Sequence, residues 1–191
     1  IDFLATDLSS GTTFNSAWLN CSSMTSFPAL SLAAATNFSY AWYNCLAMTS
    51  FPVTDLDSGT TFNNAWRGCS SLTSFPAVSL AAGTDFTYAW YNCSSMTSCP
   101  VTDLDSGTTF FRTWKGCSSM TSFPALSLAS STTFREAWAN CSSMIDFPVT
   151  DVSAGTSFSS TWQDCSSMTS FPALSLAAGT SFDYAWYNCV A

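Results

Sequence analysis

A 24-residue repeat runs through this chain and constrains its fold more than any other feature. The stretch from Cys69 to Cys93, CSSLTSFPAVSLAAGTDFTYAWYNC, returns to its starting residue after 24 positions. A unit this short cannot bury its own apolar side chains, so it is stable only when stacked between copies of itself. We therefore predict one solenoid domain of eight coils, with units at 1–24, 25–48, 49–72, 73–96, 97–120, 121–144, 145–168 and 169–191. Neither end shows an atypical unit, so we expect a segment of a longer chain.

Every unit predicts the same order of local elements. Two short apolar segments, such as 48–51 and 53–56, indicate short parallel strands, and the Pro between them belongs at a corner because it has no backbone donor. Phe, Ala, Trp and Cys then recur at i, i+3, i+4 and i+7, as in 38–45, which predicts a two-turn helix with Thr36 as its N-cap. Asn, Gly or Asp stands two residues after each Trp, and these types tolerate a left-handed backbone, so the helix or a single 3₁₀ turn should end there.

Stacking in register places equivalent residues of successive units in one column. We predict that a Phe, a Trp and a Cys column form the core: Phe14, Phe38, Phe62, Phe86, Phe110, Phe134, Phe158, Phe182, Trp18, Trp42, Trp66, Trp90, Trp114, Trp138, Trp162, Trp186, Cys21, Cys45, Cys69, Cys93, Cys117, Cys141, Cys165 and Cys189. A further Phe column is interrupted at Cys99, which we interpret as a tolerated core substitution.

Composition argues against several classes of function. Four Lys and Arg against twelve Asp and Glu give a net charge of -8, which disfavours nucleic acid as a partner. No apolar run approaches the roughly 18 residues that span a bilayer, so we expect no membrane insertion. The chain has no His, and Glu136 is its only Glu, so we expect no catalytic residues, no cofactor and no enzyme.

The Cys column permits a disulfide, a metal or a thiol interpretation. No close Cys pair of the zinc type is present, and stacked side chains with parallel Cβ vectors are poorly placed for a disulfide. We expect reduced, buried thiols and no metal in this column. The acidic steps of the odd units resemble half of a calcium loop but can equally be solvated turns, which leaves only weak calcium candidates: Asp55, Asp57, Asp103 and Asp105.

The predicted outer surface carries Tyr and cationic side chains just after the Trp column. They can form a cation–π column, or alternatively a binding or assembly surface. The possible contact surface comprises Tyr40, Tyr43, Arg67, Tyr88, Tyr91, Lys115, Tyr184 and Tyr187. Four Asn-x-Ser sequons are possible glycosylation sites or chance matches in a Ser-rich chain: Asn20, Asn37, Asn92 and Asn140. The Thr column suits ice binding less well than capping.

The pattern Ala89-Trp90-Tyr91-Asn92-Cys93-Ser94-Ser95-Met96 resembles the BspA-type leucine-rich repeats of microbial surface proteins and the related lipoprotein-type repeats of 24–26 residues. Trp stands where that family usually has Phe, and Met stands where it has Leu. The resemblance covers every unit and implies a right-handed solenoid with one parallel sheet, often in adhesive surface proteins. It implies no shared catalytic residues.

Two functions are consistent with these features. The first is a structural stretch of an extracellular fibre, stalk or surface appendage on a cell or virion, self-associating through uncapped ends or through alternating faces. The second is an adhesin or binding module that recognises a host protein or a glycan.

Overall fold

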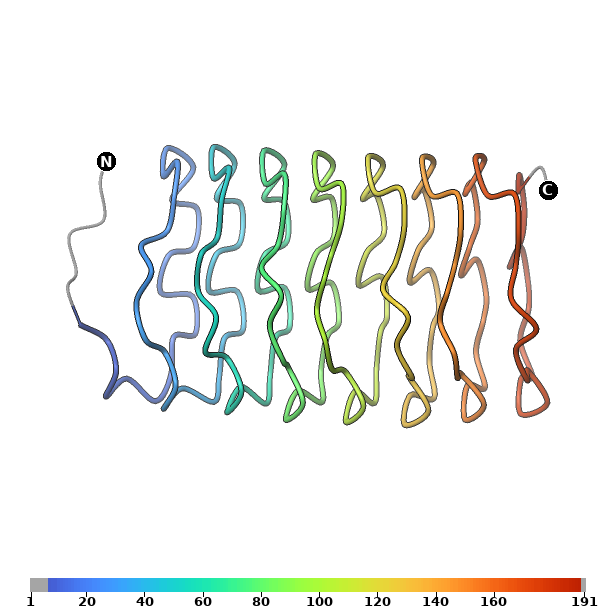
Figure 1. Cartoon of the computed structure of the whole chain (residues 1–191), viewed down its shortest axis with the longest axis horizontal. Helices are drawn as coiled ribbons and strands as arrows, with labels where there is room; N and C mark the ends of the chain where they lie inside the picture. The colour runs from blue at the N-terminus through green and yellow to red at the C-terminus, as the bar shows by residue number, and fades with distance from the viewer. Residues whose placement is uncertain (1–6, 190–191) are drawn as a thin grey trace.

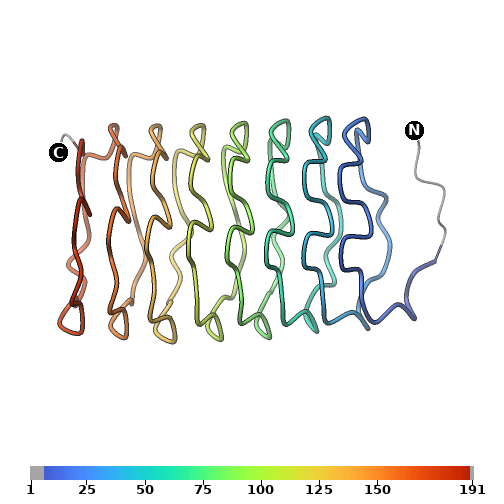
Figure 2. The same ribbon diagram turned by 180° about the vertical axis from the view of Figure 1, so that it is seen from behind.

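A computed structural model describes residues 7–189, and these form a row of stacked coils, one for each repeat (Figure 1). Seen from either side, the chain advances from one end of the row to the other without turning back (Figure 2). Each coil therefore lies only beside its neighbours in sequence, as in a repeat solenoid. Residues 1–6, which include the first apolar segment of the first unit, lie outside the described residues.

Neighbouring coils pair through isolated parallel β-bridges, each formed by one residue from each coil. Within 7–189 there is no strand longer than an isolated bridge, and no α-helix. The longest series of bridges links all eight coils through the residue before each core Phe: Thr13, Asn37, Thr61, Asp85, Thr109, Thr133, Ser157 and Ser181. The short parallel strands predicted at the two apolar segments are wrong as strands, because only scattered bridges form there: Ser26 to Ser50, Ser74 to Ser98, Ser79 to Asp103 and Ser127 to Asp151. The Pro between those segments supplies no backbone donor, which keeps the pairing short.

The helix predicted for 38–45 is also wrong. In this turn segment, the N–H groups of Phe38, Tyr40 and Trp42 donate to carbonyls of the following coil at 2.8–2.9 Å. The alternate N–H groups of Ala41 and Cys45 donate to the carbonyl three residues earlier, at 3.1 and 3.2 Å. These bonds leave no donors for the ladder of an α-helix.

The turn segment shares its side-chain period with a helix, which explains the error. Tyr40 and Asn44 both adopt a left-handed backbone conformation, with φ of 56°. The backbone conformation of the turn segment therefore repeats every four residues. The residues at i, i+3, i+4 and i+7 still point inward, and all are 0% exposed in the second coil: Phe38, Ala41, Trp42 and Cys45. The residues predicted to tolerate a left-handed backbone do have positive φ: Asn20, Asn44, Gly68, Asn92, Gly116, Asn140, Asp164 and Asn188.

Thr36 does not cap a helix. Its N–H and its Oγ1 both donate to the carbonyl of Thr12 in the preceding coil, at 3.0 and 3.4 Å. Thr60 bonds to Thr36 in the same way, at 2.8 and 3.1 Å. The Thr column is thus a line of hydrogen bonds along the stack.

Aromatic rings stack along the axis of the core. The indoles of Trp42 and Trp66 lie 5.4 Å apart with an interplanar angle of 3°, and the rings of Phe38 and Phe62 are also 5.4 Å apart. Phe51 meets Trp42 edge-on, at 4.7 Å and 75°. Such distances match the spacing of paired strands, about 4.8 Å, rather than the roughly 8–10 Å between packed helices.

The predicted core columns are least buried in the terminal coils. Phe182 and Trp186 are 37% and 39% exposed. Cys21 is exposed and Cys189 is half-buried. These coils have a neighbouring coil on one side only, whereas the ring and thiol columns of the interior coils are buried.

Candidate contact face

One side of the rod varies from coil to coil while the core columns do not. We call it the contact face and define it by the positions of Ser39, Tyr40 and Tyr43 and their equivalents in the other units. Across the eight units these three positions carry six, five and six residue types, whereas the Thr36, Phe38, Trp42 and Cys45 positions carry one each. Stacking therefore does not dictate the residues of the contact face, and they are available for another role.

All four cations of the chain lie at contact-face positions: Arg67, Arg112, Lys115 and Arg135. The guanidinium of Arg67 lies among three Tyr rings, 5.4 Å from the centroid of Tyr43 and 4.8 Å from those of Tyr88 and Tyr91. Its Nη1 also donates to Asn64 Oδ1 at 3.0 Å. The sequence-predicted contacts between Arg67 and its neighbouring Tyr residues are thus present, and they hold these rings in place.

A second cluster surrounds Glu136. Arg112 donates to both of its carboxylate oxygens at 2.9 Å, and Lys115 donates to Oε2 at 2.5 Å. Burial alone would raise the pKa of Glu136, but the hydrogen bonds from Arg112 and Lys115 outweigh it, so this pKa lies below its usual value. The same bond to Glu136 raises the pKa of Arg112. Arg112 also donates to the Tyr88 hydroxyl at 2.9 Å, which joins the two clusters.

The predicted surface residues fall into separate groups. Tyr43, Arg67, Tyr88 and Tyr91 come together, and Lys115 faces Glu136. Tyr40 contacts Tyr43, with ring centroids 5.8 Å apart. Tyr184 and Tyr187 contact each other at 5.8 Å in the last coil, beyond Ser160 and Gln163 of the seventh coil.

Sequence reasoning missed Arg112, Arg135 and Glu136 as members of this face. The signal was present, because Arg112 and Glu136 continue the column of Tyr40 and Tyr88 at intervals of 24 residues. The predicted contact surface includes only the Tyr residues of that column.

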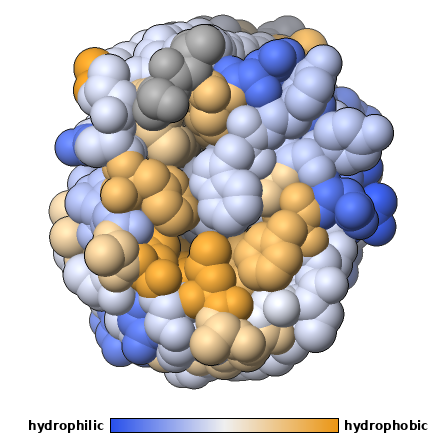
Figure 3. Space-filling view, turned by 90° about the vertical axis from the view of Figure 1, so that its right-hand side faces the viewer, coloured by the Kyte–Doolittle hydropathy of each residue, from blue (hydrophilic) through white to orange (hydrophobic). Residues whose placement is uncertain are grey.

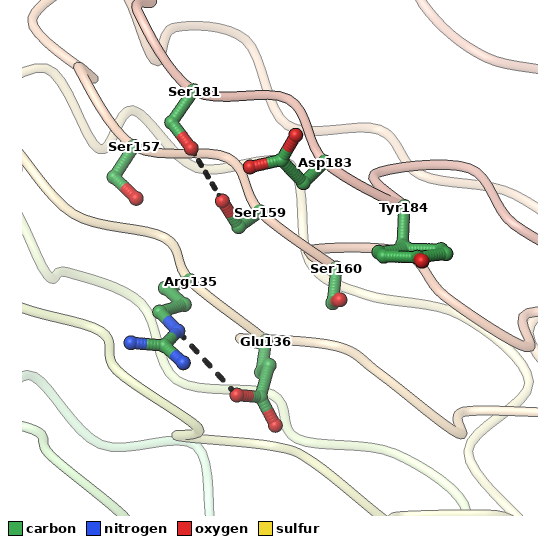
Figure 4. Close-up of a pocket in the computed structure, with 8 residues that line it drawn as sticks. All are labelled: Arg135, Glu136, Ser157, Ser159, Ser160, Ser181, Asp183 and Tyr184. Carbon is green, nitrogen blue, oxygen red and sulfur yellow. Dashed lines mark hydrogen bonds and ion pairs between the residues drawn. The ribbon is translucent and has the colours of Figure 1, made fainter.

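A hollow of about 400 Å³ lies on the contact face next to these charges. Its lining comes from three successive coils and includes Arg135, Ser160 and Asp183 (Figure 4). Ser159 and Ser160 occupy positions that carry Phe, Tyr or Arg in other coils.

The cysteines are free thiols, and seven of them make the same hydrogen bond. Each donates from Sγ to the carbonyl of the Trp 27 residues earlier, at 2.9–3.3 Å: Cys45, Cys69, Cys93, Cys117, Cys141, Cys165 and Cys189. Burial raises the pKa of Cys45 and of Cys99 to about 12 and raises that of Cys69 well above the usual value. The protonated form that donates this bond is therefore the favoured one.

Of the weak calcium candidates, Asp103 accepts a hydrogen bond within its own turn and Asp55 accepts one from the preceding coil. Asp103 Oδ1 accepts the N–H of Asp105 at 2.9 Å, and Asp55 Oδ1 accepts the N–H of Leu32 at 3.1 Å. Asp57, like Asp105, is exposed. Across residues 7–189, no three His, Cys, Asp or Glu side chains gather as a metal site. In the same range, no helix has the length and apolarity of a membrane span.

The sequon residues occupy two kinds of position. Asn20, Asn92 and Asn140 are exposed and have positive φ. Asn37 is half-buried in the bridge column, and its Oδ1 accepts the N–H of Ser39 at 2.9 Å. Glycosylation at these sites stays a prediction.

Comparison with known proteins adds little to this geometry. No family model and no curated protein matches the chain. Among solved structures, a leucine-rich repeat protein from Bacteroides ovatus is similar at 11% identity, over 94% of this chain and 80% of that one, with a TM-score of 0.29. That similarity is too weak to carry an argument. The stacked coils and the 24-residue period show a tandem-repeat solenoid, and its likeness to leucine-rich repeats is weak.

Proposed function

We propose that this chain is a rigid structural stretch of an extracellular fibre, stalk or surface appendage, without catalytic activity. The observation that carries the proposal is the uninterrupted bonding between coils. Eight coils are joined by one continuous bridge series and by stacked Phe, Trp and Cys columns, with no insertion between units. An array in which each unit bonds only to its neighbours resists bending best when every coil repeats the same contacts.

Self-association can use either the coil ends or the sides of the rod. At the C-terminal end, apolar side chains gather in the middle of the surface (Figure 3). Phe182 and Trp186 of the last coil are partly exposed, whereas the equivalent rings of interior coils stack on the next Phe and Trp. Sideways contact can instead join the cationic, Tyr-rich contact face to acidic turns such as Asp103-Leu104-Asp105.

Electron microscopy and sedimentation of the purified chain test this proposal. We expect assemblies that lengthen or bundle as protein concentration rises. Trp186→Asp should suppress end-to-end assembly, and the matched variant Tyr187→Asp, in the same coil but on the contact face, should suppress sideways assembly. High salt should also weaken sideways assembly, because exposed charges are screened. Discrete monomers at all concentrations would contradict the self-association part of the proposal.

A second function, an adhesin or binding module for a host protein or glycan, is favoured by the variation of the contact face. Tyr and Arg are enriched in protein interfaces and in their energetic hot spots. Here they replace one another at positions where the stack imposes no residue type. The ring and guanidinium contacts around Arg67 also fix those side chains before any partner arrives, which lowers the entropic cost of binding.

A further inference from the structure

The hollow on the contact face lies where one coil carries small side chains at two adjacent positions. Its floor lies in the seventh coil, which has Ser159 and Ser160 where the fifth coil has Phe111 and Arg112. Side chains of the sixth and eighth coils, among them Arg135 and Tyr184, border it (Figure 4). Small residues between large ones thus leave a space of about 400 Å³, which is within the range of small-molecule sites.

The hollow offers polar groups with unused hydrogen-bonding capacity. Within residues 7–189, neither the guanidinium of Arg135 nor the carboxylate of Asp183 makes a hydrogen bond. The contacts of Arg135 are an ion pair with Glu136 at 3.6 Å and the ring of Phe111 at 5.7 Å. Ser159 and Ser181 share one hydrogen bond at 2.5 Å and keep further lone pairs free.

Arg135 is positively charged, Asp183 is negatively charged, and Ser hydroxyls line the same hollow. A hollow lined by both charges disfavours a strongly charged ligand. Arg135 is a pure donor, Asp183 is a pure acceptor, and each Ser hydroxyl can act as either. A neutral molecule with neighbouring hydroxyl groups can bond to the donor, to the acceptor and to the Ser hydroxyls at once, since each of its hydroxyls both donates and accepts a hydrogen bond. An anion would meet Asp183, and a cation would meet Arg135.

Tyr184 adds an apolar surface beside these groups. Its side chain is 68% exposed, the largest exposed fraction among the large hydrophobic residues described. A pyranose ring has one face of C–H groups and a rim of hydroxyls. Its C–H face can cover the Tyr184 ring through weak C–H contacts while its hydroxyls face Asp183 and the Ser residues.

We propose that this hollow binds a neutral pyranose saccharide, as a terminal residue or a disaccharide unit. The proposal rests on the second candidate function, a binding module, and narrows its ligand to a glycan. Arg135 donates to the sugar, Asp183 accepts from it, and Tyr184 supports its apolar face.

Titration of the labelled protein, followed by NMR chemical shifts, tests the assignment. The probes are glucose, galactose, mannose and N-acetylglucosamine, together with glucuronic acid and N-acetylneuraminic acid. We expect saturable shifts at the hollow for at least one neutral sugar, with a Kd on the order of 1 mM for a small open site. Absence of saturable shifts with every neutral sugar, or tighter binding of an acidic sugar, would overturn the proposal.

Two variants locate the site. Ser160→Tyr fills the hollow with a residue that the same column already carries at Tyr40, Tyr88 and Tyr184, so the fold is retained. It should weaken binding about tenfold or more, as should Asp183→Ala. The matched control Ser16→Tyr makes the same exchange in the first coil and should leave the affinity unchanged. An unaltered affinity in Ser160→Tyr would place the sugar elsewhere.

The broader binding function has a separate test. Adhesion of the protein to cells or to glycoprotein-coated surfaces is compared between the parent, Ser160→Tyr and Arg67→Gln. Loss of adhesion only in Arg67→Gln, without sugar binding at the hollow, refutes the saccharide assignment and leaves the binding module standing. No adhesion by the parent refutes the binding module itself.

Discussion

The buried thiols should make this stack unusually sensitive to alkali. Seven Cys side chains are fully buried and have pKa values raised above the usual value by burial: Cys45, Cys69, Cys93, Cys99, Cys117, Cys141 and Cys165. In the unfolded chain an ordinary thiol ionises near pH 8.5. Because the pKa is raised in the folded state, the stabilisation is complete below that pH and is lost as the pH rises toward the folded value.

The size of the loss follows from the number of these thiols. Each group that is protonated when folded and ionised when unfolded lowers the free energy of unfolding by about 1.4 kcal/mol per pH unit. Seven such groups give about 10 kcal/mol per pH unit, in a domain of which a typical total stability is about 5–15 kcal/mol. The loss in the intact chain is shared among coils, since a repeat array can open in parts. We therefore expect unfolding within about two pH units above 8.5.

The assay is urea denaturation at a series of pH values, followed by circular dichroism and by Trp fluorescence. The absorbance of thiolates formed from the buried Cys side chains, recorded in parallel, should appear together with unfolding and not before it. Cys117→Val keeps an apolar side chain at one position and should reduce the pH slope by about one seventh. Cys21→Val, at the exposed end of the column, is the control and should leave the slope unchanged. A stability independent of pH between about 8.5 and 11, or ionisation of the buried thiols in the folded protein, would refute the reasoning.

Three further substitutions test particular contacts. Glu136→Gln should lower the free energy of unfolding by about 1–2 kcal/mol at neutral pH, because Arg112 and Lys115 lose their carboxylate. The pKa of Glu136 is lower in the folded protein than in the unfolded chain. The carboxylate therefore stabilises the parent protein fully above its unfolded-state pKa, and this stabilisation is lost as the pH falls toward its folded-state pKa. Urea denaturation at a series of pH values would show this loss. Gly68→Ala should lower the free energy of unfolding by about 1–2 kcal/mol, because the residue has φ of +76° and the new Cβ would clash with Asn44 Oδ1. The double variant Gly68→Ala with Asn44→Gly removes the clash and should be more stable than Gly68→Ala alone. Cys99→Phe should raise the midpoint of thermal unfolding by restoring the Phe column between Phe75 and Phe123, and a lowered midpoint would show that the ring does not fit there.

The sequence predicted contacts between coils better than conformation within them. The 24-residue period placed Trp42 over Trp66 and Phe38 over Phe62, because stacking in register leaves no other partner for them. It also identified Asn44 as a left-handed position, since few residue types adopt that backbone readily. The helix failed because the turn segment and a helix present inward residues at the same spacing. The two differ in their backbone hydrogen bonds: the N–H of Tyr40, for example, donates to Asn63 in the next coil instead of to a carbonyl of its own segment.

The contact face was predictable in part for the same reason. Tyr43, Arg67 and Tyr91 lie at one position of successive units, so stacking alone brings them together. The Glu136 cluster joins two different positions, those of Arg112 and Lys115, and their proximity depends on the turn geometry that the sequence did not reveal. The hollow depends on what is missing from the seventh coil, and an absence of bulk gives no motif.

The Trp column shows why the core tolerates few substitutions. Six of its buried indole N–H groups have no hydrogen-bond partner among the described residues: Trp42, Trp66, Trp90, Trp114, Trp138 and Trp162. A buried donor without an acceptor costs about 1–3 kcal/mol, so hydrogen bonding cannot be the reason for Trp at this position. The compensation comes from ring contacts: each indole stacks on others at 5.2–6.2 Å, and Phe51, for example, lies edge-on to both Trp42 and Trp66 at 4.7 and 5.4 Å. Since every ring serves two coils, a smaller residue would remove contacts from both, which accounts for a column that carries Trp in all eight units.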